Sequence, residues 1–172
     1  MEDRLAALEQ RVERLEARQA PGPPITATSA LELLRHLQGR AEEGAGAVAY
    51  AGAAFLGGGE YMWAGEHDLT DLMAADWAAA APVLESMGSP PRLALLAALV
   101  GGPRSRAELQ EALGGETSSG HLYHHLRELQ NAGLIGQQGR GTYAVVPRAV
   151  IPLLAILAAA LDLGRPAGTE YS

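Results

Sequence analysis

The sequence predicts a mainly α-helical protein with a small amount of β-structure. Three observations support this fold class. Between residues 105 and 131, leucines recur at intervals of three and four, which is the period of an amphipathic helix. Residues 134–146 alternate in polarity on both sides of a Gly-Arg-Gly triplet, as a short β-hairpin does. Apolar residues fill positions 150–163 almost completely, which predicts a buried helix.

The leucine-rich segment predicts two helices joined by a tight turn. Ser105 is followed three residues later by Glu108, a capping-box pattern that marks the start of a helix. The glycines at 114–115 end this helix, and a second one runs over about residues 118–131, with Gly133 as its C-cap. One face of the second helix is placed against a core by Leu122, Leu126 and Leu129. This pattern is typical of a helix-turn-helix unit, whose second helix enters the DNA major groove, followed by a wing.

One informative string of sequence lies upstream of this unit, and another lies within its second helix. Residues 84–93 read Leu-Glu-Ser-Met-Gly-Ser-Pro-Pro-Arg-Leu, and residues 118–126 read Ser-Ser-Gly-His-Leu-Tyr-His-His-Leu, with Ala-Gly-Leu-Ile following at 132–135. Over about residues 80–148 the chain resembles the ArsR-type winged helix-turn-helix transcriptional regulators. The resemblance implies a DNA-binding domain at 79–148, and a dimerisation helix with a tail at 149–172. The N-terminal region resembles no family that we recognise.

Composition limits the chemistry that the chain can perform. There is no cysteine, which excludes disulfides and thiolate metal sites, and all thirteen basic residues are arginine. The net charge is −7, but residues 88–148 hold six arginines and four acidic residues, so this part alone is positive. No set of nucleophile, base and orienting group is recognisable, so we expect neither an enzyme nor a cofactor.

The location of the protein is predicted from its apolar segments. The longest apolar run, residues 149–161, contains a proline and is shorter than the ~20 residues that a membrane span needs. The sequence starts with a charged helical pattern and shows no signal peptide. We therefore expect a cytoplasmic protein with no membrane partner.

Residues 1–20 carry a heptad pattern, with apolar a and d positions at Leu5, Leu8, Val12 and Leu15. In a parallel dimer the flanking g and e positions pair Arg4 with Glu9 and Arg11 with Glu16, whereas an antiparallel pairing sets like charges together. We therefore predict a parallel dimeric coiled coil. The alternative is an amphipathic helix packed on its own subunit.

Residues 21–78 are predicted to contain a proline-rich linker, a helix and a β-hairpin. The helix starts after Thr28 or Ser29 and runs to about Glu43. Strand-like residues at 48–55 and 60–63 flank a Gly-Gly-Gly turn at 57–59. A further helix is predicted from Leu69 to about Ala81, capped by Asp68 or Thr70. We assign the region 21–78 to dimerisation or to effector sensing.

The candidate DNA-binding residues lie on the second helix and the wing. Opposite the leucine face, or at the N-terminal end of the helix, are Ser118, Ser119, His121, Tyr123, His124 and Arg127, and Arg140 lies at the wing tip. We also expect Arg92 and either Arg104 or Arg106 to contact the DNA backbone. The alternative is that these residues form an ordinary solvated face and an exposed turn. His125 lies beside the leucines, so we expect it to be partly buried.

A metal site is not expected. His121 and His125 have the i, i+4 spacing of metal ligands, but no cysteine completes the set. Metal-sensing members of the resembled family use thiolates, or Asp and His pairs on the final helix. The final helix of this chain offers only Asp162.

Aromatic residues are concentrated in the hairpin region. We predict that an apolar effector pocket is lined by Tyr50, Phe55, Tyr61, Trp63, His67 and Trp77. The alternative is that the same side chains form the hairpin core and a dimer contact.

These observations together predict a homodimeric transcriptional repressor that binds double-stranded DNA at an inverted-repeat operator. A non-thiol small-molecule effector would release it. The alternative function is a winged-helix interaction module that binds a protein partner through its coiled coil.

Overall fold

The computed structural model describes residues 27–43, 45–115 and 119–165. Contacts divide the chain into two compact units between Gly46 and Ala47. The predicted coiled coil at 1–20, Ser118 and the tail after residue 165 lie outside the described residues. In the first unit, α2 (Ala27–Glu43) confirms the helix that the sequence predicts there.

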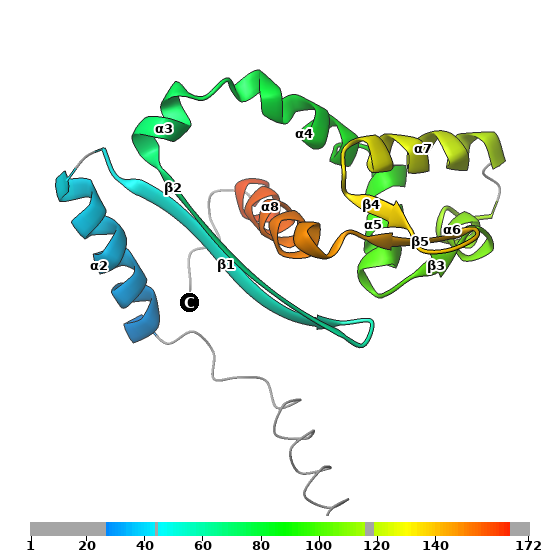
Figure 1. The fold of residues 1–172 in the computed structure, drawn as a ribbon, viewed down its shortest axis with the longest axis horizontal. Coiled ribbons are helices and arrows are strands. Elements are labelled where there is room, and N and C mark those ends of the chain that lie inside the picture. Colours follow the sequence, from blue (N-terminus) through cyan, green and yellow to red (C-terminus); the bar gives the residue numbers. More distant parts are fainter. Residues whose placement is uncertain (1–26, 44, 116–118, 166–172) are drawn as a thin grey trace, which may run out of the picture. The chain divides into compact units, whose positions relative to one another are not determined.

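The second unit contains a winged helix-turn-helix domain, drawn from green to orange in Figure 1. Its helices are α4 (Ala81–Met87), α5 (Pro90–Val100), α6 (Arg106–Ala112) and α7 (Ser119–Asn131). The strands are β3 (Arg104–Ser105), β4 (Ile135–Gln137) and β5 (Thr142–Val145), which form an antiparallel sheet in the order β3-β5-β4. The predicted helix, turn, helix and wing are therefore all present.

One hydrophobic core holds this domain together. Leucines of α5, α6 and α7 fill it and are almost fully buried: Leu95, Leu96, Leu99, Leu109, Leu122, Leu126 and Leu129. Tyr143 and Val145 of β5 close one side, and α8 (Val150–Leu163) adds Val150, Ile151 and Leu153. Burying a leucine side chain stabilises a fold by ~1.5–3 kcal/mol, so this cluster fixes the position of α7.

A two-stranded hairpin precedes the domain. β1 (Ala47–Leu56) and β2 (Gly59–Asp68) are each ten residues long and pair only with each other in the described residues. The turn residues Gly57 and Gly58 have positive φ angles of 56° and 79°, which only glycine adopts readily, and they match the turn predicted there. Both strands are longer than the predicted 48–55 and 60–63. The larger difference is in β2, which continues through His67 and Asp68.

Two glycines mark close contacts between the hairpin and the rest of the unit. β1 and β2 both pack on α8, as Figure 1 shows. A Cβ atom on Gly52 would lie 2.8 Å from Cγ2 of Ile151, so the backbone of β1 packs directly on this side chain of α8. A Cβ atom on Gly57 would lie 2.8 Å from Cα of Gly102, so the hairpin turn meets the backbone that follows α5.

The helix predicted at Leu69–Ala81 is wrong as one continuous element. The structure has α3 (Leu69–Ala74), a 3-10 helix η1 (Trp77–Ala80), and then α4. Asp68 caps α3 as predicted, by accepting a hydrogen bond from the backbone N–H of Thr70 at 2.8 Å. Asp76 interrupts the helical run because its side chain accepts from the N–H of Ala78 and starts η1 instead.

Helix α8 is buried only over its first half. Val150, Ile151 and Leu153 are buried, whereas Leu161 and Leu163 leave 70% and 87% of their surface exposed. The second half of this apolar helix is therefore exposed in a single chain, and its burial in a dimer interface stays a prediction. No helix among the described residues is long and apolar enough to cross a membrane.

Candidate nucleic-acid interface

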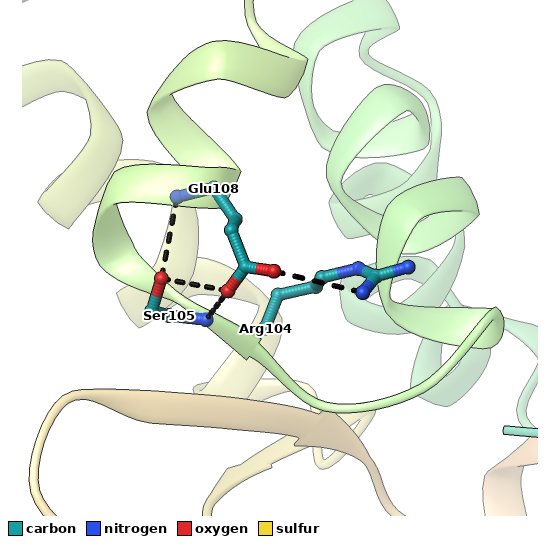
Figure 2. Close-up of polar contacts among 3 residues, drawn as sticks. All are labelled: Arg104, Ser105 and Glu108. Atoms are coloured by element: carbon teal, nitrogen blue, oxygen red, sulfur yellow. Dashed lines mark hydrogen bonds and ion pairs between the residues drawn. The ribbon is translucent and has the colours of Figure 1, made fainter.

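The start of α6 is fixed by the predicted capping box, shown in Figure 2. The Ser105 N–H donates to Oε2 of Glu108 at 2.8 Å, and the Glu108 N–H donates to Oγ of Ser105 at 3.4 Å. The Ser105 hydroxyl also donates to Oε2 at 2.7 Å. These hydrogen bonds from Ser105, and to a smaller extent the charge of Arg104, hold the pKa of Glu108 below its usual value.

The turn between α6 and α7 begins with a glycine cap. Gly114 has a φ of 88°, and the N–H groups of Gly114 and Gly115 donate to the carbonyls of Glu111 and Gln110 at 2.8 and 3.1 Å. This is the Schellman pattern. Helix α7 ends in the same way at Gly133, as predicted, because Leu134 N–H donates to the Leu129 carbonyl at 3.0 Å.

Helix α7 presents a polar face to solvent. Its apolar face is buried through the three leucines that the sequence predicts. The opposite face exposes Tyr123, His124 and Arg127, and Tyr123 leaves 57% of its surface in water. Ser119 and His121 are exposed at the N-terminal end of the helix. The predicted contact residues that the structure describes on α7 therefore all lie at the surface.

His125 differs from the other two histidines of α7. Its side chain is half-buried, and its Nδ1 atom is buried with no hydrogen-bond partner. Burial lowers the pKa of His125, and the charges of Arg92, His124 and His121 lower it further. A neutral imidazole is the favoured form here, so His125 adds no charge to the surface of α7 and belongs to its packing side, as predicted.

The wing places one arginine at its tip. The sheet is closed there by hydrogen bonds from Gln138 N–H to the Thr142 carbonyl at 2.8 Å and from Arg106 N–H to the Gly141 carbonyl at 3.2 Å. Arg140 is exposed between two glycines, each with a φ of 77°. Exposed Gln137 and Gln138 precede the tip, and no pattern in the sequence marks these two polar side chains.

Two of the other arginines are engaged within the domain. Arg92 donates from Nε to the Ser86 carbonyl at 2.5 Å and from Nη2 to the Glu85 carbonyl at 2.6 Å, so it caps the end of α4. The contact of Arg92 with the DNA backbone stays a prediction. Arg104 lies 3.6 Å from the Glu108 carboxylate, whereas Arg106 is exposed.

The six aromatic and histidine residues of the predicted effector pocket do not share one face. Strand register places Tyr50, Tyr61, Trp63 and His67 on the hairpin face that includes Gly52, and Phe55 on the opposite face. Tyr50 and His67 stack with ring centroids 6.1 Å apart, while Tyr61 packs against the core. Trp77 lies in η1, where its Nε1 donates to the Leu72 carbonyl at 2.8 Å. The effector pocket stays a prediction.

Part of the chain is similar to known helix-turn-helix proteins. Residues 87–137 match a family model described as a helix-turn-helix domain, and no curated protein matches the chain. A predicted DNA-binding transcriptional regulator from E. coli is 32% identical over 54% of this chain and 99% of its own, with a TM-score of 0.43.

Two other solved structures share less sequence. The homodimeric winged helix-turn-helix domain of Mb0332 from Mycobacterium bovis, a possible ArsR-family regulator, is 20% identical over 64% of this chain and 100% of its own, with a TM-score of 0.46. The transcriptional repressor BigR from Xylella fastidiosa is 22% identical over 57% of this chain and 99% of its own, with a TM-score of 0.44. The family-model match and the observed helix, turn, helix and wing identify residues 87–137 as part of a winged helix-turn-helix domain, similar to the DNA-binding domains of ArsR-type transcription regulators.

Proposed function

We propose that this regulator is a homodimeric repressor that reads an inverted-repeat operator with α7. The observation that carries the proposal is the division of α7 into a buried leucine face and an exposed polar face. The exposed face offers Arg127 for bidentate contact with guanine, together with the hydrogen-bonding side chains of Tyr123 and His124. Ser119 lies at the N-terminal end of the helix, which approaches base edges in this motif, and Ser118 precedes it in the sequence.

The wing supplies a second type of contact. Arg140 is exposed at the tip, where a guanidinium between two glycines has room to approach a phosphate or the minor groove. Phosphate contacts position a protein on DNA, and base contacts specify the sequence. Arg140 therefore supports affinity and α7 supports specificity.

Two-fold symmetry links the protein to the form of its operator. A homodimer with one α7 per subunit reads two half-sites whose centres lie about 34–36 Å apart, on one face of the duplex. An effector that changes the spacing of the two helices weakens contact at one half-site and releases the operator. Because the chain has no cysteine, that effector acts without thiol chemistry.

One observation favours a second function, a winged-helix module that binds a protein partner. Outside residues 88–148 the chain holds seven arginines and sixteen acidic residues. An acidic surface repels DNA and suits a basic protein partner. The partner would then pair with the heptad segment at 1–20.

DNA binding by the full chain discriminates between these functions. Fluorescence anisotropy is measured on duplex from upstream of the coding sequence and on unrelated duplex, at several salt concentrations. A regulator binds one duplex at least ~10³-fold more tightly than the other. If the upstream duplex shows no preference, selection from genomic fragments extends the test. Failure of both experiments would leave the interaction module as the better proposal.

A further inference from the structure

The proposed function does not use a hollow that lies beside the reading helix. We call it the α7 pocket. Its volume is about 390 Å³, which is within the range of small-molecule sites, about 300–1,000 Å³. Three helices of the winged-helix domain line it: α5 through Pro90, Pro91 and Ala94, the end of α6 through Ala112 and Leu113, and α7 through His121 and His125.

Most of the wall of the α7 pocket is apolar. Five of its seven lining residues are proline, alanine or leucine. Alanine and proline side chains project little from a helix, so they leave space between α5, α6 and α7 at this place, although the leucines of the same helices meet in the core. Apolar walls with a few polar groups are typical of sites that bind small organic molecules.

The polar part of the wall consists of two imidazoles, one helical turn apart on α7. His121 is exposed, whereas His125 is half-buried. The Nδ1 atom of His125 is buried without a hydrogen-bond partner among the described residues. Buried polar atoms in folded proteins nearly always have a partner. The imidazole of His125 therefore has hydrogen-bonding capacity that a ligand can satisfy.

The charges that act on His125 favour an anionic ligand. Burial is the main cause of the lowered pKa of His125, and the positive charges of Arg92, His124 and His121 lower this pKa further. A place that disfavours an added positive charge for this reason favours a negative one. A carboxylate is a suitable group, because it accepts hydrogen bonds and imidazoles donate them.

We propose that the α7 pocket binds a small organic molecule with an apolar body and one carboxylate. The apolar body packs between the prolines of α5 and Leu113 of α6, and the carboxylate accepts hydrogen bonds from His121 and His125. In the complex His125 takes up a proton from solvent, because the carboxylate stabilises the charged imidazole. This site is separate from the hairpin residues that the sequence suggests for an effector.

The position of the site links the ligand to DNA binding. His121 lies at the N-terminal end of α7 and is one of the predicted DNA contacts. A carboxylate that holds His121 withdraws this side chain from DNA, and its negative charge repels the phosphates nearby. The ligand therefore weakens DNA binding. This regulatory consequence rests on the proposed function, whereas binding of the ligand does not.

NMR titration of the full chain tests binding, with cinnamate as the probe. The expected dissociation constant is about 1 mM or lower, with the largest amide shifts in α7 and around Ala94. Two probes are matched controls: cinnamamide keeps the apolar body without the charge, and acetate keeps the charge without the ring. Each is expected to bind about tenfold more weakly or worse. Equal binding of cinnamamide or of acetate would overturn the proposal.

A pair of variants locates the site. Ala94→Leu places a larger side chain in the α7 pocket and is expected to weaken cinnamate binding by about tenfold or more. Ala97→Leu is the control, because Ala97 is exposed on the same helix and does not line the pocket, so cinnamate binding should stay unchanged. Circular dichroism verifies that both variants fold. Unchanged affinity in a folded Ala94→Leu variant contradicts the proposal.

Titration of the wild-type chain gives a second readout that needs no variant. Saturating cinnamate is expected to raise the pKa of His125 by about one pH unit or more, as NMR of the imidazole measures. A pKa that does not rise would show that the carboxylate lies away from this ring, and would overturn the proposal.

Fluorescence anisotropy then tests the link to DNA. Saturating cinnamate is expected to weaken binding of the preferred duplex by about tenfold, whereas acetate at the same concentration leaves it unchanged. Cinnamate binding in the α7 pocket with unchanged DNA affinity refutes the regulatory consequence. A chain that binds cinnamate in this pocket but prefers no duplex refutes the proposed repressor and leaves the ligand site standing.

Discussion

Gly52 of β1 lies against Ile151 of α8 so closely that a Cβ atom at position 52 would be 2.8 Å from Cγ2 of the isoleucine. Ile151 is buried in the core of the winged-helix domain. The hairpin therefore packs on Ile151, a side chain that also belongs to the core of the winged-helix domain. Substitutions in β1 affect the stability of both parts.

Gly52→Val is expected to lower the free energy of unfolding by about 1–3 kcal/mol, because the added methyl groups overpack a site that is already filled. Urea denaturation of the full chain measures the effect. Ala53→Val is the control, since Ala53 is exposed on the other face of the hairpin and has room for the larger side chain. Equal stability of the two variants would show that β1 is not closely packed against α8 at Gly52.

Arg92→Lys is expected to lower stability by about 1.5–3 kcal/mol, because a lysine cannot reproduce both guanidinium hydrogen bonds to the Glu85 and Ser86 carbonyls. Thermal unfolding measures the loss. Arg106→Lys is the matched control, as Arg106 is exposed. A loss of DNA affinity in Arg92→Lys without any loss of stability would show that Arg92 acts at the DNA interface and not as a cap of α4.

The pKa of Glu108 is expected to rise toward its usual value in Ser105→Ala, because the serine hydroxyl that donates to the carboxylate is removed. Carbon-detected NMR titration of the Glu108 carboxyl measures the shift. Because the folded-state pKa is depressed, the stabilisation by Glu108 is complete above the unfolded value of about 4.5 and is lost as pH falls through the folded-state pKa. Stability curves for wild type and Ser105→Ala should therefore converge in acid.

His125 is expected to make the fold less stable as pH falls below 6.5. Its pKa is lowered in the folded state, so the unfolded chain binds the proton more readily between the folded-state pKa and 6.5. Denaturation at pH 7.5 and pH 5.5 measures the difference. His125→Gln removes this contribution, whereas His124→Gln, an exposed neighbour, should retain it. An identical pH dependence in wild type and His125→Gln would show that the imidazole is solvated.

Arg127→Ala is expected to cost about 1–3 kcal/mol in operator binding and to relax specificity at one base position, if the side chain contacts guanine as proposed. Anisotropy titrations with single-base operator variants measure both effects. Arg35→Ala removes the same charge from exposed α2 and serves as the control. Unchanged affinity in Arg127→Ala would remove α7 from the role of reading helix.

Arg140→Ala is expected to weaken binding to all duplexes by a similar factor. The slope of log affinity against log salt should fall by about one, because one phosphate contact is lost. Titrations at several salt concentrations measure the slope. A change confined to the operator, with an unchanged slope, would mean that Arg140 reads bases and not phosphates.

Local features of the fold could be predicted because they depend on neighbours in sequence. The capping box needs only Ser105 and Glu108, and the buried face of α7 follows from the spacing of its leucines. The hairpin turn follows from its glycines. The length of β2 could not be predicted, because the residues that continue it from Ala64 to Asp68 are mostly of types that are depleted in strands.

Other features depend on contacts that no local pattern indicates. The break between α3 and η1 occurs in an alanine-rich segment without proline or glycine, where only the cap at Asp76 ends the helix. The role of Arg92 depends on the angle between α4 and α5, which brings its guanidinium to two carbonyls at the preceding helix end. An arginine near a DNA-reading helix is otherwise most simply interpreted as a DNA contact.

The contact between Gly57 and Gly102 fixes the length of the hairpin as well as the position of its turn. Backbone meets backbone there, at one end of a hairpin whose body crosses Ile151 at Gly52. Removing one cross-strand pair between these points would withdraw the turn from Gly102 by about one residue rise of ~3.4 Å. The two glycine contacts therefore fix the number of residue pairs between them. Homologues that keep both contacts are expected to keep the length of the hairpin while varying its outward-facing side chains.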